Sequence, residues 1–453
     1  MRGVDFKDLL FIAVLAVGLL IRLVLAPYSS GSDVVQFAGF AKTFHRHGFC
    51  FYRYASAHSS ESWPFNWPYL YGPVLMYLLG ALAHIVPPIY DILWQGDSYS
   101  IYVSTNWVFA LKFIYILFDV AITIAIYLIT RSVYASTIFY LNPATIYISS
   151  IYGMFDQMAA AVIIIGIYML SRKRFWLSGI VLGISLMIKQ TMLFPIVGLG
   201  ISLLLRNKAK NLFIAITGFT MGILAMLAPI LLFCPSSLQG IFGTLYMVKP
   251  RYAEPIMYNF NGVTGIATLI HRFNTCGEFC GYEILWSIEH WYLFTAILSP
   301  FVAVSTLVIR DLYKLSTLYY ILFTATYWGV NYQYLVPEIA FIAIASAYEK
   351  DRWLKALYIA ASIYIALWVF IYPAEWWFRA HIHNPNAALA EIMGRASLNV
   401  YCDNIYAIYS LILTQLHYAI ILRTSIHSIT NARLCFSKLI RFSASKFSAT
   451  VIE

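Results

Sequence analysis

The sequence predicts an all-α protein that crosses a membrane many times. Of its 453 residues, 61% are hydrophobic and only 11% carry a charge, and the mean hydropathy is +0.73. This composition supplies too few polar side chains to cover a water-facing surface. Apolar runs long enough to cross hydrocarbon recur along the chain, which predicts a polytopic bundle of about 12 transmembrane helices.

The predicted spans follow the apolar runs in chain order. Those in the second quarter of the chain are short, and we expect them to be tilted or buried in protein. The set is 8–26, 108–130, 134–151, 157–171, 175–189, 191–205, 211–233, 291–309, 315–330, 333–349, 354–372 and 404–422.

The distribution of Lys and Arg predicts the orientation of these spans. With the N-terminus placed in the cytoplasm, about two-thirds of the 30 Lys and Arg residues fall on the cytoplasmic side. We therefore expect a transmembrane catalytic domain over 1–422 and a basic cytoplasmic tail over 423–453. The same topology accounts for the net charge of +10, so no nucleic-acid partner is expected.

The long loops are predicted on the extracytoplasmic side, together with most acids and histidines. The first of them contains an amphipathic stretch from Asp33 to Gly48, which suits a helix lying in the membrane interface. A second apolar stretch, 69–86, ends at Pro87-Pro88 and is expected to be interfacial or re-entrant. These outer loops are 27–107, 234–290 and 373–403.

Asp33 is the first candidate for a chemical role. It follows the first span and precedes an aromatic stretch that contains Trp67, Tyr69 and Tyr71. A carboxylate beneath aromatic side chains can be desolvated enough to act as a general base toward a hydroxyl, and aromatic faces suit sugar rings. The structural alternatives are a solvated loop residue, an N-cap, and an ordinary interfacial aromatic belt.

Asp156 and Lys189 are predicted on the same side as Asp33. Asp156 lies in a very short turn, where capping the following helix is the structural alternative. Lys189 lies at the outer end of a span, and a cation at that depth is unfavourable unless it binds an anion or pairs with an acid. Lys189 is therefore a candidate for substrate binding, with pairing to Asp156 as the alternative.

Four further residues complete the candidate site. Lys249 and Arg251 are outer cations that could hold a phosphate, although contact with lipid head groups is the competing interpretation. Gln333 and Tyr334 close a short outer turn with groups that can bond sugar hydroxyls, and helix packing is an equally good explanation.

Other polar residues give weaker signals. His381 and His383 lack further fixed ligands, so no cofactor is expected and a divalent metal is not supported. A disulfide between Cys276 and Cys280 is one possibility. Asp119 lies within a span and needs a partner, either Lys112 on the same helical face or a residue of a neighbouring span.

Taken together, these segments resemble the GT-C glycosyltransferases, membrane enzymes that take sugars from polyprenyl-phosphate carriers. The resemblance is closest to the mannosyltransferase branches, including the first mannosyltransferase of GPI-anchor synthesis and prokaryotic polyprenyl-phosphate-mannose enzymes. Two departures are the absence of a second acid close to Asp33 and of the oligosaccharyltransferase signature Trp-Trp-Asp-Tyr-Gly. The matching residues are Asp33 with Phe37, 41–48 with Tyr52, 67–74, Lys112 with Asp119, 141–143, 153–157, 179–183 with Lys189, and 331–334 with Pro337.

The resemblance implies a membrane glycosyltransferase. A hexose, mannose above all, would pass from a polyprenyl-phosphate donor to a glycolipid or glycan acceptor on the extracytoplasmic face, with inversion and with Asp33 as general base. Lys189 and Gln333 would lie near the donor or the acceptor. The short cytoplasmic loops favour the cell membrane of a prokaryote over the endoplasmic reticulum. A multi-span transporter or lipid-linked sugar flippase, and a catalytically silent scaffold, are the alternatives.

Overall fold

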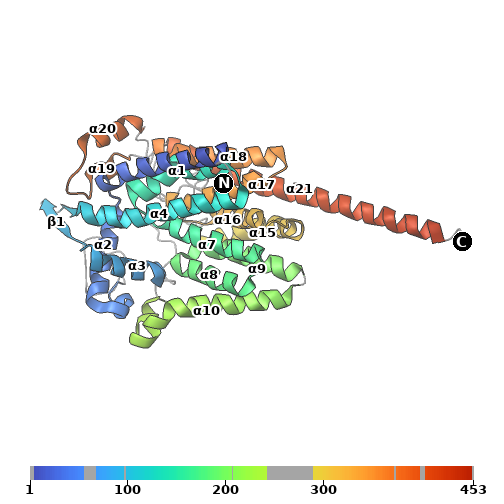
Figure 1. Ribbon diagram of the computed structural model, residues 1–453, viewed down its shortest axis with the longest axis horizontal. Helices are drawn as coiled ribbons and strands as arrows, with labels where there is room; N and C mark the ends of the chain where they lie inside the picture. Colours follow the sequence, from blue (N-terminus) through green and yellow to red (C-terminus); the bar gives the residue numbers. More distant parts are fainter. Residues whose placement is uncertain are drawn as a thin grey trace.

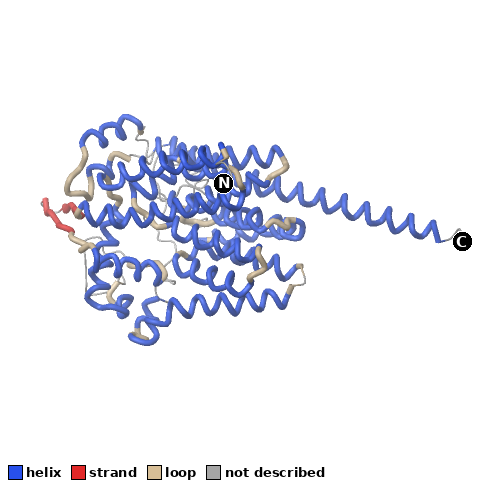
Figure 2. Tube along the Cα trace, in the orientation of Figure 1, coloured by secondary structure: helices blue, strands red, loops and turns tan. Residues whose placement is uncertain are grey.

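Helices running in roughly parallel directions make up most of the protein, with a small hairpin at one end and a long helix leaving the other (Figures 1 and 2). The computed structural model describes residues 5–55, 68–95, 98–206, 208–241, 289–371, 374–397 and 404–450. The main helices of the bundle are α1 (Phe6–Leu25), α4 (Thr105–Thr130), α5 (Val133–Tyr140), α7 (Asp156–Ser171), α8 (Phe175–Ile188), α9 (Leu193–Leu205), α10 (Ala209–Phe233), α15 (Trp291–Val308), α16 (Leu312–Thr326), α17 (Leu335–Tyr348), α18 (Arg352–Ile371) and α21 (Asn404–Thr450).

The long apolar helices identify an integral membrane protein. Every predicted span coincides with helical structure, and several of these helices are shorter than a full crossing. The number that cross the membrane therefore stays a prediction. Within the described part of the chain, five segments are long and apolar enough to cross by length and composition, namely Phe6–Tyr28, Thr105–Thr130, Ala209–Phe233, Trp291–Val308 and Arg352–Ile371.

The predicted span 134–151 is a broken helix. After α5 come α6 (Pro143–Ile146) and the π-helical turn η3 (Tyr147–Tyr152). The break arises because Asn142 caps α6 with its side chain and Pro143 cannot continue α5. The next residues lead into α7, so this break places Tyr152 and Asp156 close together at one end of the bundle.

The first outer loop contains both predicted interfacial helices. They are α2 (Ser32–His47), which is followed by the 3-10 turn η2 (Gly48–Arg53), and α3 (Pro73–Ile85). The buried face of α2, including Val34, Phe37 and Phe40, contacts α3 and the main hydrophobic core.

An antiparallel hairpin corrects the purely helical prediction for this loop. Its strands are β1 (Tyr90–Gln95) and β2 (Ser98–Val103). In β2, Ile101 and Val103 are buried while Tyr102 between them is partly exposed. This alternation has the period of a strand, and it is too short to have stood out among the surrounding apolar runs.

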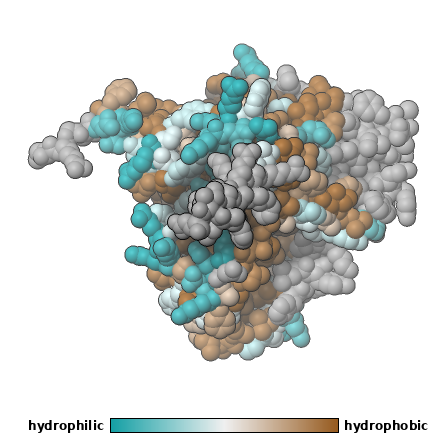
Figure 3. Space-filling view, turned by 90° about the vertical axis from the view of Figure 1, so that its right-hand side faces the viewer, coloured by the Kyte–Doolittle hydropathy of each residue, from teal (hydrophilic) through white to brown (hydrophobic). Residues whose placement is uncertain are grey.

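The last helix continues past the predicted boundary at residue 422. Helix α21 runs without a break through the end of the predicted span, and its C-terminal part extends beyond the bundle (Figure 1). Arg423 pairs with Asp351 at 2.6 Å. Seen from this end, hydrophilic residues gather toward the centre and left of the face, and hydrophobic residues lie toward its upper right and its lower edge (Figure 3). Exposed Arg172, Lys173 and Arg174 suit the cytoplasmic end predicted from charge.

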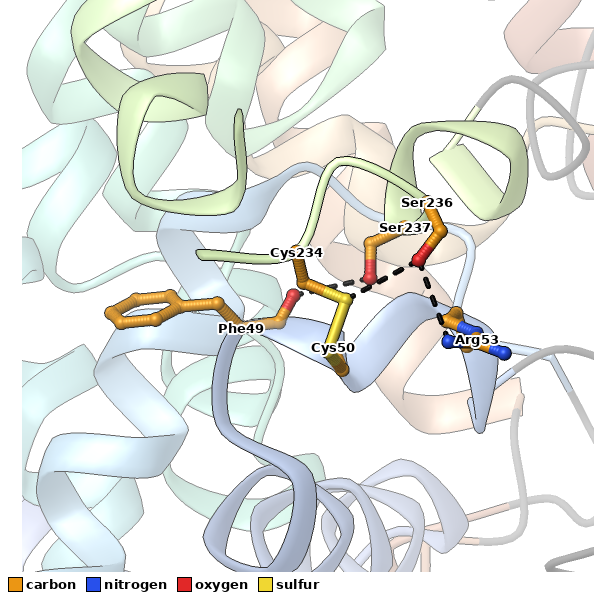
Figure 4. Close-up of a disulfide and its surroundings, with 6 residues drawn as sticks. All are labelled: Phe49, Cys50, Arg53, Cys234, Ser236 and Ser237. Carbon is orange, nitrogen blue, oxygen red and sulfur yellow. Dashed lines mark hydrogen bonds between the residues drawn. A yellow bond between two sulfur atoms is a disulfide. The ribbon is translucent and has the colours of Figure 1, made fainter. Parts of the chain in front are cut away.

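A disulfide joins Cys50 in η2 to Cys234, the residue after α10 (Figure 4). Beside it, the Ser237 hydroxyl donates a hydrogen bond to the Phe49 carbonyl oxygen at 3.1 Å. The disulfide therefore links the first outer loop to the start of the second outer loop. Cys276 and Cys280, the pair suggested by sequence, lie outside the described residues.

Candidate active site

Asp33 lies in the first turn of α2 and is buried, with 8% of its surface exposed. It is therefore not a solvated loop residue, and the N-cap of α2 is Gly31. The Tyr152 hydroxyl donates a hydrogen bond to Asp33 Oδ2. Burial raises the pKa of Asp33 above its ordinary value, while the Tyr152 hydrogen bond and the charge of Lys189 oppose this rise.

Backbone contacts hold the turn that carries Asp33. The Gly31 N–H donates to the Tyr152 carbonyl at 2.9 Å, and the Ser30 N–H donates to the Trp377 carbonyl at 2.7 Å. A side chain at Gly31 would collide with Tyr152, since a Cβ there would lie 2.4 Å from the tyrosine ring. Tyr152 therefore fixes both the backbone and the carboxylate of this turn.

Lys112 joins α4 to the segments on either side of the Asp33 turn and of Tyr152. Its ammonium lies 2.5–3.2 Å from five oxygen atoms, which belong to Ala26, Ser29, Ser150 and Ile151. These acceptors connect the end of α1 to η3, so Lys112 has a structural role beside the site.

The partner of Asp119 comes from a neighbouring predicted span. Arg22 in α1 pairs with Asp119 in α4 at 2.9 Å, and both side chains are fully buried. Of the two partners considered from sequence, the neighbouring span is therefore the correct one and Lys112 is not.

Lys189 and Asp156 form a buried ion pair close to Asp33. Asp156 is in the first turn of α7, and Lys189 follows the last residue of α8. The Lys189 ammonium also lies 4.2 Å from the centre of the Tyr334 ring and 5.2 Å from that of Phe155. The pairing considered as the structural alternative is thus present, and a substrate role for either residue stays a prediction.

The aromatic stretch reaches the site through Tyr71. The Tyr71 ring packs edge-on against Phe155 at 4.8 Å and against Phe37 at 6.2 Å. Tyr69 is buried behind it, with ring centres 5.4 Å apart. Gly72 presses on the end of α8, where a Cβ would lie 1.8 Å from the Met187 carbonyl oxygen. Trp67, Lys249 and Arg251, also predicted at the site, lie outside the described residues.

Gln333 and Tyr334 belong to the 3-10 turn η5 (Tyr332–Tyr334). Tyr334 faces Lys189, and its carbonyl accepts a hydrogen bond from Tyr320 at 2.8 Å. Gln333 is buried, and its Oε1 has no hydrogen-bond partner among the described residues. The structure therefore brings Tyr334 to the Asp156–Lys189 pair and leaves a polar group of Gln333 available.

Sequence reasoning missed several buried polar groups beside the predicted acids. Gln157 follows Asp156, and neither of its amide atoms has a hydrogen-bond partner in the described part of the chain. Gln36 Nε2, one helical turn beyond Asp33, is likewise unpartnered among the described residues, as is the Tyr115 hydroxyl. Buried polar groups normally have partners, so such a set next to carboxylates suits a site for a polar substrate. The available signal was the position of Gln157, one residue after Asp156, and of Gln36, three residues after Asp33.

At one end of this bundle of apolar helices, a buried carboxylate lies beside polar groups that have no hydrogen-bond partner among the described residues, an arrangement that suits a membrane enzyme with a polar substrate. Residues 69–330, more than half of the chain, match glycosyltransferase family 87. The chain belongs to this family, which confirms the predicted enzyme class and disfavours the transporter and scaffold alternatives. Family membership does not decide the predicted mannosyltransferase branch.

Comparison with solved structures gives a more distant likeness. The chain is similar to ArnT from Cupriavidus metallidurans, whose crystal structure is bound to undecaprenyl phosphate, with a TM-score of 0.45 and 12% sequence identity. The match covers 92% of this chain and 77% of that one. No curated protein matches the chain.

Proposed function

We propose that this glycosyltransferase transfers a hexose, with mannose as the first candidate, from a polyprenyl-phosphate sugar to a hydroxyl of a lipid-linked or glycan acceptor. The observation that carries the proposal is the environment of Asp33. This buried carboxylate is oriented by Tyr152, and the amides beside it have no partner within the described part of the chain. A general base and a polar surface for sugar hydroxyls are the two requirements of transfer to a hydroxyl.

In this scheme Asp33 removes the proton of the acceptor hydroxyl. The Tyr152 hydrogen bond occupies Asp33 Oδ2, so Oδ1 takes the proton. The acceptor oxygen forms a bond to the anomeric carbon as the bond from that carbon to the phosphate oxygen breaks, and the carrier leaves with both electrons as polyprenyl phosphate. Attack opposite the leaving group inverts the configuration at the anomeric carbon.

The remaining site residues orient the substrates. The amides of Gln36, Gln157 and Gln333 can bond sugar hydroxyls, and the Tyr71 ring can cover a sugar face. The Lys189 ammonium, although paired with Asp156, adds positive potential near the departing phosphate. Lys249 and Arg251 remain candidates for direct contact with that phosphate. No nucleotide is needed, because the carrier phosphate is itself the leaving group.

The proposed orientation places this site on the extracytoplasmic side. The Cys50–Cys234 disulfide supports it, because both cysteines belong to predicted outer loops and disulfides persist in oxidising compartments. A polyprenyl-linked donor that is presented on that side would reach Asp33 without crossing the bundle.

The test is transfer of radiolabelled sugar by the purified protein in lipid nanodiscs. Synthetic polyprenyl-phosphate-mannose is compared with the glucose and galactose analogues, and labelled products are separated into lipid and glycan fractions. Transfer from one carrier sugar, with the anomeric configuration inverted in the product, is the expected result. Transfer only from nucleotide sugars, or leaflet exchange of the carrier without any transfer, would overturn the proposal.

A further inference from the structure

A basic cavity lies at the far end of α2 from Asp33. It has a volume of about 480 Å³ and is formed by the last turns of α2, the end of α3 and the segment that follows α3. The lining residues are Lys42, His45, Arg46, Ala83, His84, Pro87, Pro88 and Ile89. With a rise of 1.5 Å per residue, Lys42 is about 14 Å and Arg46 about 20 Å from Asp33 along the helix. The cavity is therefore separate from the candidate active site.

Two cations and two histidines make up half of the residues that line this cavity, and the other half are apolar. Lys42 and Arg46 lie one turn apart on α2, and the His45 and His84 rings pack edge-on with centres 5.3 Å apart. The Lys42 ammonium lies 3.8 Å from the centre of the ring of Tyr90, the residue that follows Ile89 of the lining. Partial burial lowers the pKa of Lys42 and the charge of Arg46 lowers it further, although Asp91 raises it. A bound anion would relieve this repulsion.

The surface beside the cavity is hydrophobic and exposed. Ile85 is 78% exposed, and Ile89 and Leu93 are each 54% exposed. In an interfacial segment, such side chains face the acyl chains of lipids. Cations next to an exposed apolar surface at the membrane boundary match the two parts of an anionic lipid, whose phosphate contacts the cations while its chains cover the apolar residues.

We propose that this cavity binds the phosphate head group of an anionic membrane lipid, with Lys42 and Arg46 as the principal contacts and His45 and His84 completing the site. The bound lipid anchors the C-terminal end of α2 to the membrane surface. This site does not depend on the proposed transfer reaction, since it concerns bulk lipid and leaves Asp33 uninvolved.

The experiment uses full-length protein in nanodiscs that contain a trace of a photoactivatable phosphatidylglycerol, with the crosslinked peptides identified by mass spectrometry. We expect labelling within 42–46 and 84–89. Excess unlabelled phosphatidylglycerol should remove this labelling, while phosphatidylcholine with the same chains and inorganic phosphate should not. Competition by inorganic phosphate would indicate a site for soluble anions. Competition by polyprenyl phosphate much stronger than that by phosphatidylglycerol would indicate a site for the carrier lipid. Either result would overturn the proposal.

Charge-removing variants locate the contacts. Replacing both cations, Lys42→Gln with Arg46→Gln, should lower labelling of 42–46 and 84–89 by at least about tenfold, because each near-surface cation contributes to head-group binding. The matched control, Arg172→Gln with Arg174→Gln, removes two exposed cations at the other end of the bundle and should leave that labelling unchanged. Equal labelling in both double variants, with both monodisperse by size-exclusion chromatography, would contradict the assignment.

Discussion

The carboxyl group of Asp33 is buried and hydrogen-bonded to Tyr152, and in the proposed mechanism its protonation state controls activity. A base must be ionised, and burial raises the pKa of Asp33 above the ordinary value for aspartate of about 3.9. The acid limb of the kcat/KM profile should therefore lie at higher pH than for an exposed aspartate, with activity falling as the pH drops through it. A profile that stays flat down to about pH 4 would contradict this assignment.

Tyr152 tunes this carboxylate through one hydrogen bond. Donation to Asp33 Oδ2 stabilises the ionised form, so Tyr152→Phe should raise the pKa of Asp33 and move the acid limb to higher pH. We also expect kcat to fall about tenfold, because a hydrogen bond to a charged group contributes roughly 1.5–3 kcal/mol and only part of it concerns the reaction. The control is Tyr168→Phe, because Tyr168 lies near the C-terminal end of α7, away from Asp33. An unchanged acid limb in Tyr152→Phe would show that the hydrogen bond does not act on the base.

The site was predictable from sequence where position along the chain was enough. Asp33, Asp156 and Lys189 all follow or begin apolar runs at one predicted face, and the structure brings these three together. The hydrogen bond from Tyr152 was not predictable, because the tyrosine sits on a π-helical turn whose side-chain directions do not follow an α-helical period.

At the scale of elements, Gly72 sets how closely α3 approaches α8. A Cβ at Gly72 would lie 1.8 Å from the Met187 carbonyl oxygen, which is backbone and cannot move aside easily. Gly72→Ala should push the Tyr69–Tyr71 segment away from the site, lowering both the apparent Tm and the transfer rate at a cost of about 1–3 kcal/mol. At Gly200 in α9 the nearest atom to such a Cβ is 3.9 Å away. Gly200→Ala should therefore be neutral or stabilising, and equal losses in both variants would refute the close approach.

The elements themselves were mostly predictable, since the apolar runs became helices, the amphipathic stretch became α2 and the apolar stretch 69–86 became α3. The exceptions have local causes. Asn142 and Pro143 divide one predicted span into short helices. The hairpin of β1 and β2 is too short for its alternating pattern to outweigh the surrounding helices. Helix α21 continues past 422 because polar residues follow its apolar part without a helix-breaking residue.

At the scale of the whole molecule, the disulfide is the contact that sequence could least predict. Cys50 and Cys234 are 184 residues apart, and sequence spacing does not indicate which distant cysteines meet. Peptide mapping of membranes without reductant should recover the linked pair. Cys50→Ser should lower the apparent Tm, as a lost disulfide typically costs about 2–4 kcal/mol, whereas Cys435→Ser in the extending part of α21 should not. Recovery of free thiols at both positions would contradict the extracytoplasmic orientation.

In the proposed mechanism, Asp33 is the base of the glycosyl transfer. The most direct measurement is single-turnover transfer from polyprenyl-phosphate-mannose, or from the carrier sugar found to be active, with donor binding measured in parallel for wild type, Asp33→Asn and Asp91→Asn. Asp91 is an exposed acid on the hairpin, paired with His383 at 3.1 Å, and serves as the matched control. Asp33→Asn should lose at least about a hundredfold in rate while keeping its donor affinity, because general-base catalysis contributes 10²–10⁴. Equal rates for Asp33→Asn and wild type would show that Asp33 is not the base and would make Asp156 the next residue to test.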